Sequence, residues 1–91
     1  MTNAEIAAVF TDIAELLKLK KENIFKVRAY QKVADYIKDW PSEVEQLVKE
    51  GRLREIPGVG EAIAKKLTEL VTSGRLEYYE KLKAEVAEKT K

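Results

Sequence analysis

The chain has 91 residues, 45% hydrophobic and 36% charged, with a formal net charge of +1, which suits one domain with a single modest core. It has no histidine and no cysteine, which excludes disulfides and catalytic triads built on those residues and argues against a zinc site. It has no apolar run of 18 residues and no signal-peptide pattern, so we expect a cytoplasmic protein that does not interact with a membrane.

The first predicted helix covers residues 3–19. Thr2 and Glu5 have the spacing of a capping box, in which each side chain bonds the backbone of the other. The apolar residues that follow recur at steps of three and four, which places them on one helical face. They are Ile6, Val9, Phe10, Ile13, Leu16 and Leu17. A polar break over residues 20–23 separates this helix from the next.

The second predicted helix begins at Ile24 or Phe25 and runs to Trp40. Pro41 ends it, because the residue before a proline is driven out of the helical region of backbone space. The side chains expected on its inward face are Val27, Tyr30, Val33, Ala34 and Ile37.

Three further helices follow. Ser42-Glu43-Val44-Glu45 has capping-box spacing and opens a short helix that ends at Gly51. Helical periodicity resumes over residues 61–73, ends at Gly74, and returns from Leu76 onward. The apolar residues of these helices are Val44, Leu47 and Val48, then Ile63, Ala64, Leu67, Leu70 and Val71, then Leu76, Tyr79, Leu82 and Val86.

No segment alternates apolar and polar residues for long enough to predict a strand. We therefore predict an all-α protein, a compact bundle of about five short helices. A single domain is expected over residues 1–88, with residues 89–91 as a frayed tail.

Two of the four glycines flank one valine in Pro57-Gly58-Val59-Gly60, just before a predicted helix. Glycine tolerates positive φ and close approach, so this spacing predicts a hairpin too tight for larger side chains. The backbone amides of residues 58–62 would then lie unpaired at the positive end of the helix dipole, where an anion binds well. These four residues alone also fit a tight turn between two helices that binds no ligand.

Charge is distributed unevenly along the chain. Residues 18–32 hold six basic side chains against one acidic side chain, a net charge of +5, whereas residues 1–17 and residues 33–51 each sum to −3. This distribution fits either an anion-binding surface or an ordinary solvated helical face.

The hairpin extends to a longer pattern. Leu53, Ile56-Pro57-Gly58-Val59-Gly60 and Ala64 match the helix-hairpin-helix signature, here at about residues 52–72. This resemblance implies contact with the DNA backbone, which positions a protein without reading sequence.

The resemblance covers nearly the whole chain, about residues 3–85. FKVRAYQKVADYIKDWP, followed by LREIPGVGEAIAKKLTELVTSGRL, is similar to the amino-terminal, lyase-type domain of family X DNA polymerases such as DNA polymerase beta, most of all the bacterial and archaeal members. The carboxylates of a polymerase palm are absent, so the resemblance implies the leading part of a larger polymerase or a free-standing relative. The resemblance further implies a role in base excision repair and binding to gapped, nicked or 5′-phosphate-bearing DNA. A monomer located at the nucleoid is also expected.

By this resemblance Lys66 is the lysine that forms a Schiff base with a 5′-deoxyribose phosphate, and Tyr30 lies against it. The chemistry needs a neutral amine near pH 7, and burial or a neighbouring cation lowers a lysine pKa toward that range. Lys65, next along the chain, is the cation we expect to act on Lys66. The alternative for Lys66 is an ordinary solvated helix lysine. The alternative for Tyr30 is a core tyrosine whose hydroxyl lies at the edge of the core.

Further roles also follow from the resemblance alone. Phe25 takes the place of a residue that stacks on a template base, and the backbone amides of the hairpin contact phosphate. The residues expected on DNA or its phosphates are Phe25, Lys26, Arg28, Lys32, Arg54, Gly58, Val59, Gly60, Ala62 and Lys65. The backbone carbonyls of Arg54, Ile56 and Val59 correspond to ligands of a monovalent cation, K⁺ or Na⁺, and no other cofactor is implied.

The chain departs from the family pattern at three positions. Ala62 and Tyr78 stand where the family has phosphate-binding lysines, and Glu55 replaces a basic residue beside the hairpin. We therefore expect DNA binding with weakened 5′-phosphate affinity, and fewer like charges near Lys66 to lower its pKa. Tyr78, Tyr79 and Trp40 are interpreted as packing residues.

One alternative belongs to a different class of function. Small helical domains also serve as protein-protein interaction modules without nucleic-acid binding, and the glutamate-rich carboxy-terminal helix would fit that role.

Overall fold

The structure is a computed structural model that describes residues 1–89, with side chains described through Glu88. Five α-helices and one short 3₁₀ turn account for most of the chain. In order they are α1 (Asn3–Leu19), α2 (Ile24–Lys38), α3 (Val44–Glu50), η1 (Leu53–Glu55), α4 (Glu61–Ser73) and α5 (Glu77–Lys89). No strand occurs within these residues, so the predicted all-α class is confirmed.

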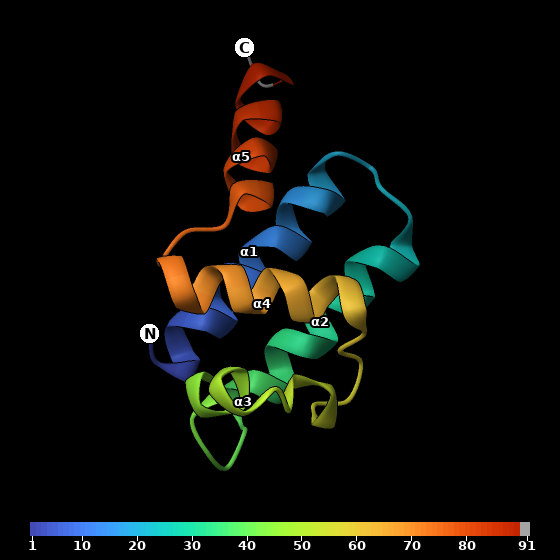
Figure 1. The fold of residues 1–91 in the computed structure, drawn as a ribbon. Helices are drawn as coiled ribbons and strands as arrows, with labels where there is room; N and C mark the ends of the chain where they lie inside the picture. The colour runs from blue at the N-terminus through green and yellow to red at the C-terminus, as the bar shows by residue number, and fades with distance from the viewer. Residues whose placement is uncertain (90–91) are drawn as a thin grey trace.

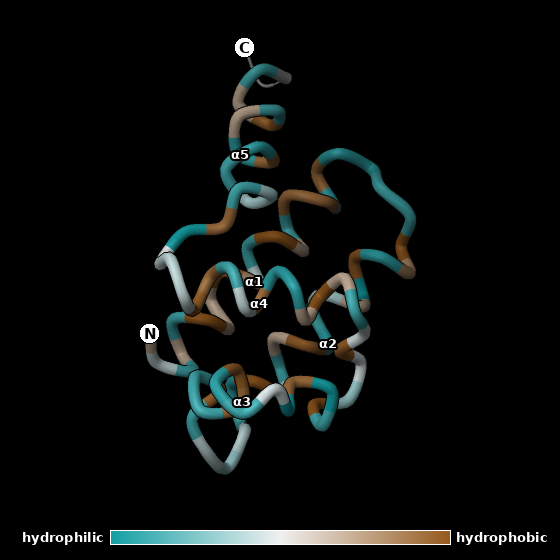
Figure 2. Tube along the Cα trace, in the orientation of Figure 1, coloured by the Kyte–Doolittle hydropathy of each residue, from teal (hydrophilic) through white to brown (hydrophobic). Residues whose placement is uncertain are grey.

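Helices α1 and α2 form the centre of the fold, and the other helices lie around them (Figure 1). The five inward residues predicted for α2 are all buried. Figure 2 shows apolar residues, in brown, alternating with hydrophilic ones along each helix. α5 stands away from the other helices in Figure 1 and gives the molecule its long dimension, 42 × 25 × 21 Å.

The amino-terminal capping box of α1 is confirmed. The Thr2 hydroxyl accepts a hydrogen bond from the Glu5 amide at 3.1 Å, and the Glu5 carboxylate accepts one from the Thr2 amide at 2.8 Å. Both bonds satisfy amides that would otherwise lack partners at the helix start.

The second predicted capping box, at Ser42, is wrong. Glu43 is the cap position of α3, and no side chain of that turn bonds the helix amides. Asn3 takes this role from α1: its amide oxygen accepts a bond from the Val44 amide at 2.8 Å, and its amide nitrogen donates to the Ser42 carbonyl at 2.7 Å. A tertiary contact therefore replaces the local one.

Two boundaries differ slightly from those predicted. α2 ends at Lys38 rather than Trp40, because Asp39 and Trp40 close the helix with backbone bonds to Asp35 and Ile37. Lys89 is the last residue of α5, and positions 90 and 91 of the predicted tail lie outside the described residues. Over residues 1–89 no helix is both long and apolar enough to cross a membrane.

Asn3→Ala should destabilise the protein by about 1–2 kcal/mol, because it leaves the Val44 amide without its acceptor. Urea unfolding followed by circular dichroism measures the change. Ser42→Ala is the matched control and should shift the free energy of unfolding by less than about 0.5 kcal/mol. Equal losses in the two variants would show that the local capping box is the one that operates.

Candidate nucleic-acid interface

The glycine hairpin is fixed to the core on one side and open on the other. Ile56 and Val59 are 0% and 7% exposed, whereas Pro57, Gly58 and Gly60 face solvent. Gly58 has a φ of +87°, and a side chain there would meet Val33 of α2 at 3.5 Å. A residue with a side chain would be strained at this positive φ, so the backbone favours glycine here, whereas 3.5 Å to Val33 is an ordinary van der Waals contact.

The start of α4 is suited to an anion. Its cap residue is Gly60, which has no side chain to satisfy the first helix amides. Those amides and the helix dipole favour negative charge at this point. Glu61 is the acidic residue of the first turn, and its carboxylate lies 3.7 Å from the Lys65 ammonium.

Glu55, the acidic residue that departs from the family pattern, does not act as a free charge beside the hairpin. Arg52 donates to both of its carboxylate oxygens, one of them at 2.9 Å, and this pairing lowers the pKa of Glu55. The pair is exposed, so it contributes little to stability. Arg52 also donates to Glu50 at 2.7 Å, so one guanidinium is shared by two carboxylates and the three side chains keep a net negative charge.

Tyr78 of α5 is the aromatic surface on which two lysines converge. The Lys66 ammonium lies 4.6 Å from the centre of its ring and the Lys26 ammonium lies 5.9 Å from it. Both distances fall within the range of cation–π attraction. Lys66 comes from α4 and Lys26 from α2, so three helices form this cluster. Tyr78 packs on Tyr30, as its interpretation as a packing residue predicts, and its ring also receives the two lysines.

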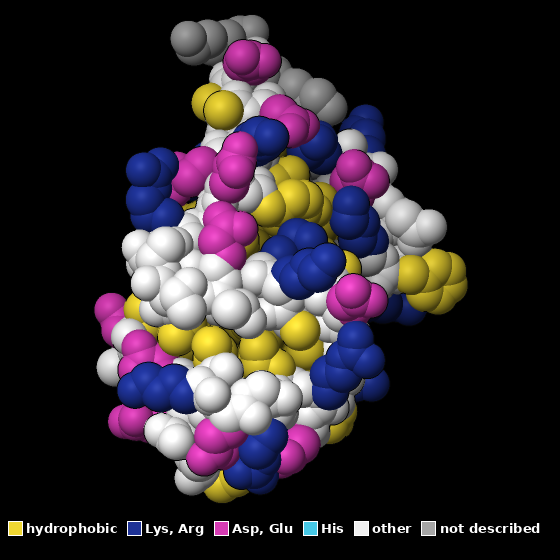
Figure 3. All heavy atoms as spheres, viewed as in Figure 1, with side chains coloured by type: hydrophobic (Ala, Val, Ile, Leu, Met, Phe, Trp, Pro, Cys, Tyr) yellow, Lys and Arg dark blue, Asp and Glu magenta, His cyan; other side chains and the backbone are white. Residues whose placement is uncertain are grey.

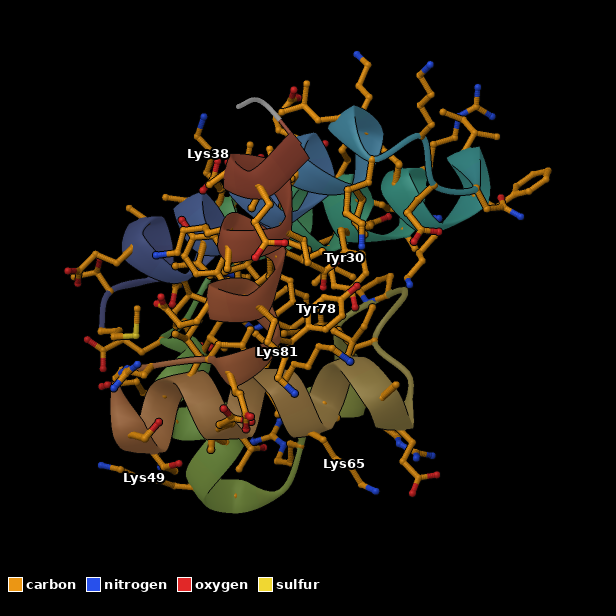
Figure 4. All side chains as sticks on the ribbon, turned by 90° about the horizontal axis from the view of Figure 1, so that it is seen from above. Tyr30, Lys38, Lys49, Lys65, Tyr78 and Lys81 are labelled. Carbon is orange, nitrogen blue, oxygen red and sulfur yellow. The ribbon has the colours of Figure 1, made fainter. Side chains whose placement is uncertain are left out.

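Tyr30 continues the aromatic cluster into the core. Its ring stacks on Tyr78 at 6.1 Å and on Phe10 of α1 at 5.8 Å. Burial, together with the nearby Tyr78 hydroxyl, raises the pKa of Tyr30, so its hydroxyl stays protonated at any physiological pH. The Tyr78 hydroxyl is itself buried and makes no hydrogen bond within residues 1–89. Figure 4 shows the two tyrosine side chains close together beside α5.

Burial lowers the pKa of Lys66, and the Lys26 ammonium lowers it further, against a smaller opposite effect of Glu69. Lys65, which we expected to be the neighbouring cation, is not among these causes. It is exposed and lies against Glu61, because adjacent residues on a helix point about 100° apart. The cation that acts on Lys66 comes from α2 instead.

A groove of about 610 Å³ runs between α4 and α5 beside this cluster. Three lysines and three glutamates are among its lining residues, which are Glu61, Ala62, Lys65, Lys66, Glu69, Leu76, Glu77, Tyr78 and Lys81. On the same side of the molecule Figure 3 shows an apolar patch flanked by Lys and Arg side chains, with carboxylates at its edges.

The charges of the groove are mostly satisfied within it. Lys65 pairs with Glu61, and Lys81 lies 3.4 Å from Glu77. Glu69 accepts a hydrogen bond from the Glu77 amide and so caps α5. Among the described residues Lys66 is the groove lysine that has no ion pair with a carboxylate.

The other expected contacts lie around this centre. Phe25 is 74% exposed at the first turn of α2, where the Asn23 side chain caps the helix, and Arg28 and Lys32 are exposed on the same helix. The Arg54 side chain lines a separate hollow of about 230 Å³ with Ala64 and Thr68. Arg54 therefore lies on a different side of α4 from Lys66, so the two would contact different parts of a DNA backbone.

The three carbonyls expected to hold a monovalent cation belong to η1 and the hairpin. The Ile56 carbonyl accepts a hydrogen bond from the Val59 amide at 3.1 Å, which closes the turn. The prediction that the amides of residues 58–62 are all unpaired is therefore wrong at Val59. A carbonyl oxygen has a second lone pair, so this bond leaves Ile56 able to act as a ligand. Ion binding at Arg54, Ile56 and Val59 stays a prediction.

A family model described as a helix-hairpin-helix domain matches residues 1–76. The chain belongs to this family. Membership of the helix-hairpin-helix family indicates nucleic-acid binding. The match ends where α5 begins, so Tyr78 lies beyond the part that defines the family.

Lys66 should be the lysine whose amine becomes reactive at the lowest pH, because a lowered pKa means that the ammonium loses its proton earlier as pH rises. Reductive methylation with ¹³C-formaldehyde, followed by NMR of the methylated amines between pH 6 and 11, measures this for each lysine. Exposed Lys65 is the internal reference, and Lys66→Arg assigns the signal. Identical titration of the two amines would contradict the expectation.

Proposed function

We propose that this chain is the DNA-binding domain of a family X DNA polymerase, which holds the DNA backbone and the 5′-phosphate at gaps or nicks during base excision repair. The observation that supports this most directly is the convergence of Lys66 and Lys26 on Tyr78, where neither ammonium is paired with a carboxylate in the described residues. Two unpaired cations near an open helix start suit a dianionic phosphate.

In this proposal the protein contacts DNA with three kinds of group. The first amides of α4 and its helix dipole hold one phosphate, and the exposed basic side chains of α2 follow the backbone. The exposed Phe25 ring stacks on an unpaired base at the gap. The backbone carbonyls of Arg54, Ile56 and Val59 would hold a K⁺ or Na⁺ ion, which would supply positive charge for a further phosphate.

The same site supports 5′-deoxyribose phosphate lyase chemistry. The neutral Lys66 amine attacks the C1′ aldehyde of the abasic sugar, and loss of water gives an imine. A water molecule removes a C2′ proton, a C2′–C3′ double bond forms, and the C3′–O bond breaks with its electron pair on the departing phosphate oxygen. This step releases the phosphate-terminated strand and leaves the sugar on Lys66 until water hydrolyses the imine. Tyr30 remains protonated, so it acts here as a hydrogen-bond donor and not as the base.

The protein should bind gapped DNA with a 5′-phosphate at about micromolar Kd, and this affinity should fall steeply with salt. Lys26→Ala should weaken it about tenfold, because a charge-assisted phosphate contact is worth roughly 1.5 kcal/mol. Fluorescence anisotropy with a labelled gapped duplex measures the change. Lys38→Ala is the matched control, since Figure 4 places Lys38 well away from Tyr78.

The comparison of DNA ends tests the end-recognition part of the proposal. Equal affinity for blunt duplex and for a 5′-phosphorylated gap would refute it while leaving backbone binding intact.

NMR shifts confined to α5 on addition of DNA would favour the protein-interaction alternative. That alternative gains little from the α5 glutamates themselves, because Glu77 and Glu80 pair with lysines of the same helix and Glu85 pairs with Lys20.

Borohydride should trap a covalent adduct between the protein and DNA that carries a 5′-deoxyribose phosphate, because reduction of the imine makes the bond permanent. Lys66→Ala should abolish trapping, and Lys65→Ala should retain most of it. Adducts are measured by denaturing gel electrophoresis and located by peptide mass spectrometry. Trapping that persists in Lys66→Ala would assign the chemistry to another lysine.

A further inference from the structure

Lys66 shares the groove between α4 and α5 with three carboxylates, those of Glu61, Glu69 and Glu77. Glu69 lies three positions beyond Lys66 on α4, a spacing at which oppositely charged side chains of a helix can pair. Among the side chains that the structure describes, Lys66 nevertheless forms no ion pair. Its ammonium lies over the Tyr78 ring, 4.6 Å from the ring centre. The group that receives Lys66 is therefore an aromatic ring and not a carboxylate.

The three carboxylates have other partners. Glu61 lies 3.7 Å from the Lys65 ammonium, and Glu77 lies 3.4 Å from the Lys81 ammonium. Glu69 accepts a hydrogen bond from the Glu77 amide at 2.8 Å. This bond satisfies one of the amides that would otherwise lack a partner at the start of α5. The carboxylate nearest to Lys66 along α4 is thus used to hold α5.

The same bond helps to fix the position of the Tyr78 ring. Tyr78 directly follows Glu77, so the bond to Glu69 holds the backbone just before the ring. Leu76, on the other side of Glu77, is 1% exposed and anchors the beginning of α5 in the core. The Tyr30 ring stacks on Tyr78 with centroids 6.1 Å apart and planes inclined by 16°. Backbone contacts and stacking therefore both hold the ring.

The amine held by this ring lies close to the start of α4. Ala62 belongs to the first turn of α4 and Lys66 lies four positions beyond it, so both are on one face of the helix and line the same groove. Four residues of an α-helix rise about 6 Å. A 5′-phosphate bound at the first amides of α4 would therefore place its own sugar alongside the Lys66 amine.

We propose that Tyr78 is a positioning residue for the Schiff-base reaction: its ring holds the Lys66 amine in the groove beside the bound sugar, and Glu69 keeps the ring in place. This inference rests on the proposed lyase function. Tyr78 acts through Lys66 and does not contact the substrate. An aromatic ring suits this role because its attraction for an ammonium is weaker than that of a carboxylate at ion-pair distance, so it holds the side chain and favours the charged form less strongly.

The ring affects the charge and the location of the amine in opposite ways. Its attraction favours the ammonium, so loss of the ring should lower the pKa of Lys66 and raise the neutral fraction at pH 7. The other charged groups around the amine would be retained: Lys26 of α2, Glu69 of α4, and the Glu77–Lys81 pair of α5. A slower reaction together with a lower pKa would therefore identify positioning, because a purely electrostatic role predicts a faster reaction.

Two substitutions separate the ring from the hydroxyl. Tyr78→Leu keeps an apolar side chain and removes the ring, whereas Tyr78→Phe removes only a buried hydroxyl that has no hydrogen-bond partner in the described residues. In the full chain with ¹³C-methylated lysines, the Lys66 signal should lie upfield of the Lys65 signal, because the Tyr78 ring current shields it. Tyr78→Leu should abolish this difference and lower the Lys66 pKa by about 0.5, and Tyr78→Phe should retain both values. Tyr36→Leu, at an exposed tyrosine of α2, is the matched control and should change neither.

The Glu69 contribution needs a second pair of variants. Glu69→Gln keeps an oxygen that can accept the Glu77 amide bond, so the upfield Lys66 signal should persist. Glu69→Ala removes the acceptor and should weaken the upfield shift, because the start of α5 loses its cap. Equal Lys66 signals in these two variants would remove Glu69 from the proposal.

Borohydride trapping at saturating concentrations of DNA that carries a 5′-deoxyribose phosphate measures the reaction itself. Tyr78→Leu should slow adduct formation about tenfold or more, at pH 7 and also at pH 9, where more of the amine is neutral. Tyr78→Phe should restore the rate. Trapping by Tyr78→Leu that is as fast as in the parent chain, or a Lys66 signal that does not respond to loss of the ring, would overturn the positioning role alone. Absence of any adduct with the parent chain would refute the lyase function, and this proposal with it.

Discussion

The candidate site depends on a column of three aromatic rings. Phe10, Tyr30 and Tyr78 come from α1, α2 and α5, and each ring stacks on the next with centroids 5.8 and 6.1 Å apart. The inner two are part of the hydrophobic core, so the column is held by burial. Its outer ring is the surface against which Lys66 and Lys26 lie. Without this column, the Lys66 and Lys26 ammonium groups would lack the Tyr78 ring that attracts both of them.

The column also explains how a helix outside the matched family region contributes to the site. α5 reaches the rest of the fold through buried Leu76 and Leu82, and through polar contacts of Tyr79 with Asp12 and of Lys20 with Glu85. The Asp12 contact raises the pKa of Tyr79 to about 12. These contacts on α1 fix the rotation of α5, and that rotation turns Tyr78 toward Lys66. Tyr78 thus takes up a place where the family resemblance implies a lysine, with a ring in place of a charge.

Helix α2 joins the core to the candidate interface. Its first half is basic and exposed, and its buried face carries Tyr30 into the column. The glycine hairpin sits against the middle of this helix, where Gly58 approaches Val33.

The sequence determined the helices and the hairpin, because these depend on local chemistry. Periodicity predicted the inward face of α2 residue by residue, and glycine spacing predicted the open turn before α4. Only the tertiary structure decided the partners of the site. The cap of α3 comes from Asn3, the cation beside Lys66 is Lys26 and not Lys65, and Tyr78 faces the lysines. Each of these contacts joins residues more than ten positions apart. Such contacts are set by the packing angles between helices, and a single sequence carries no periodic signal for those angles.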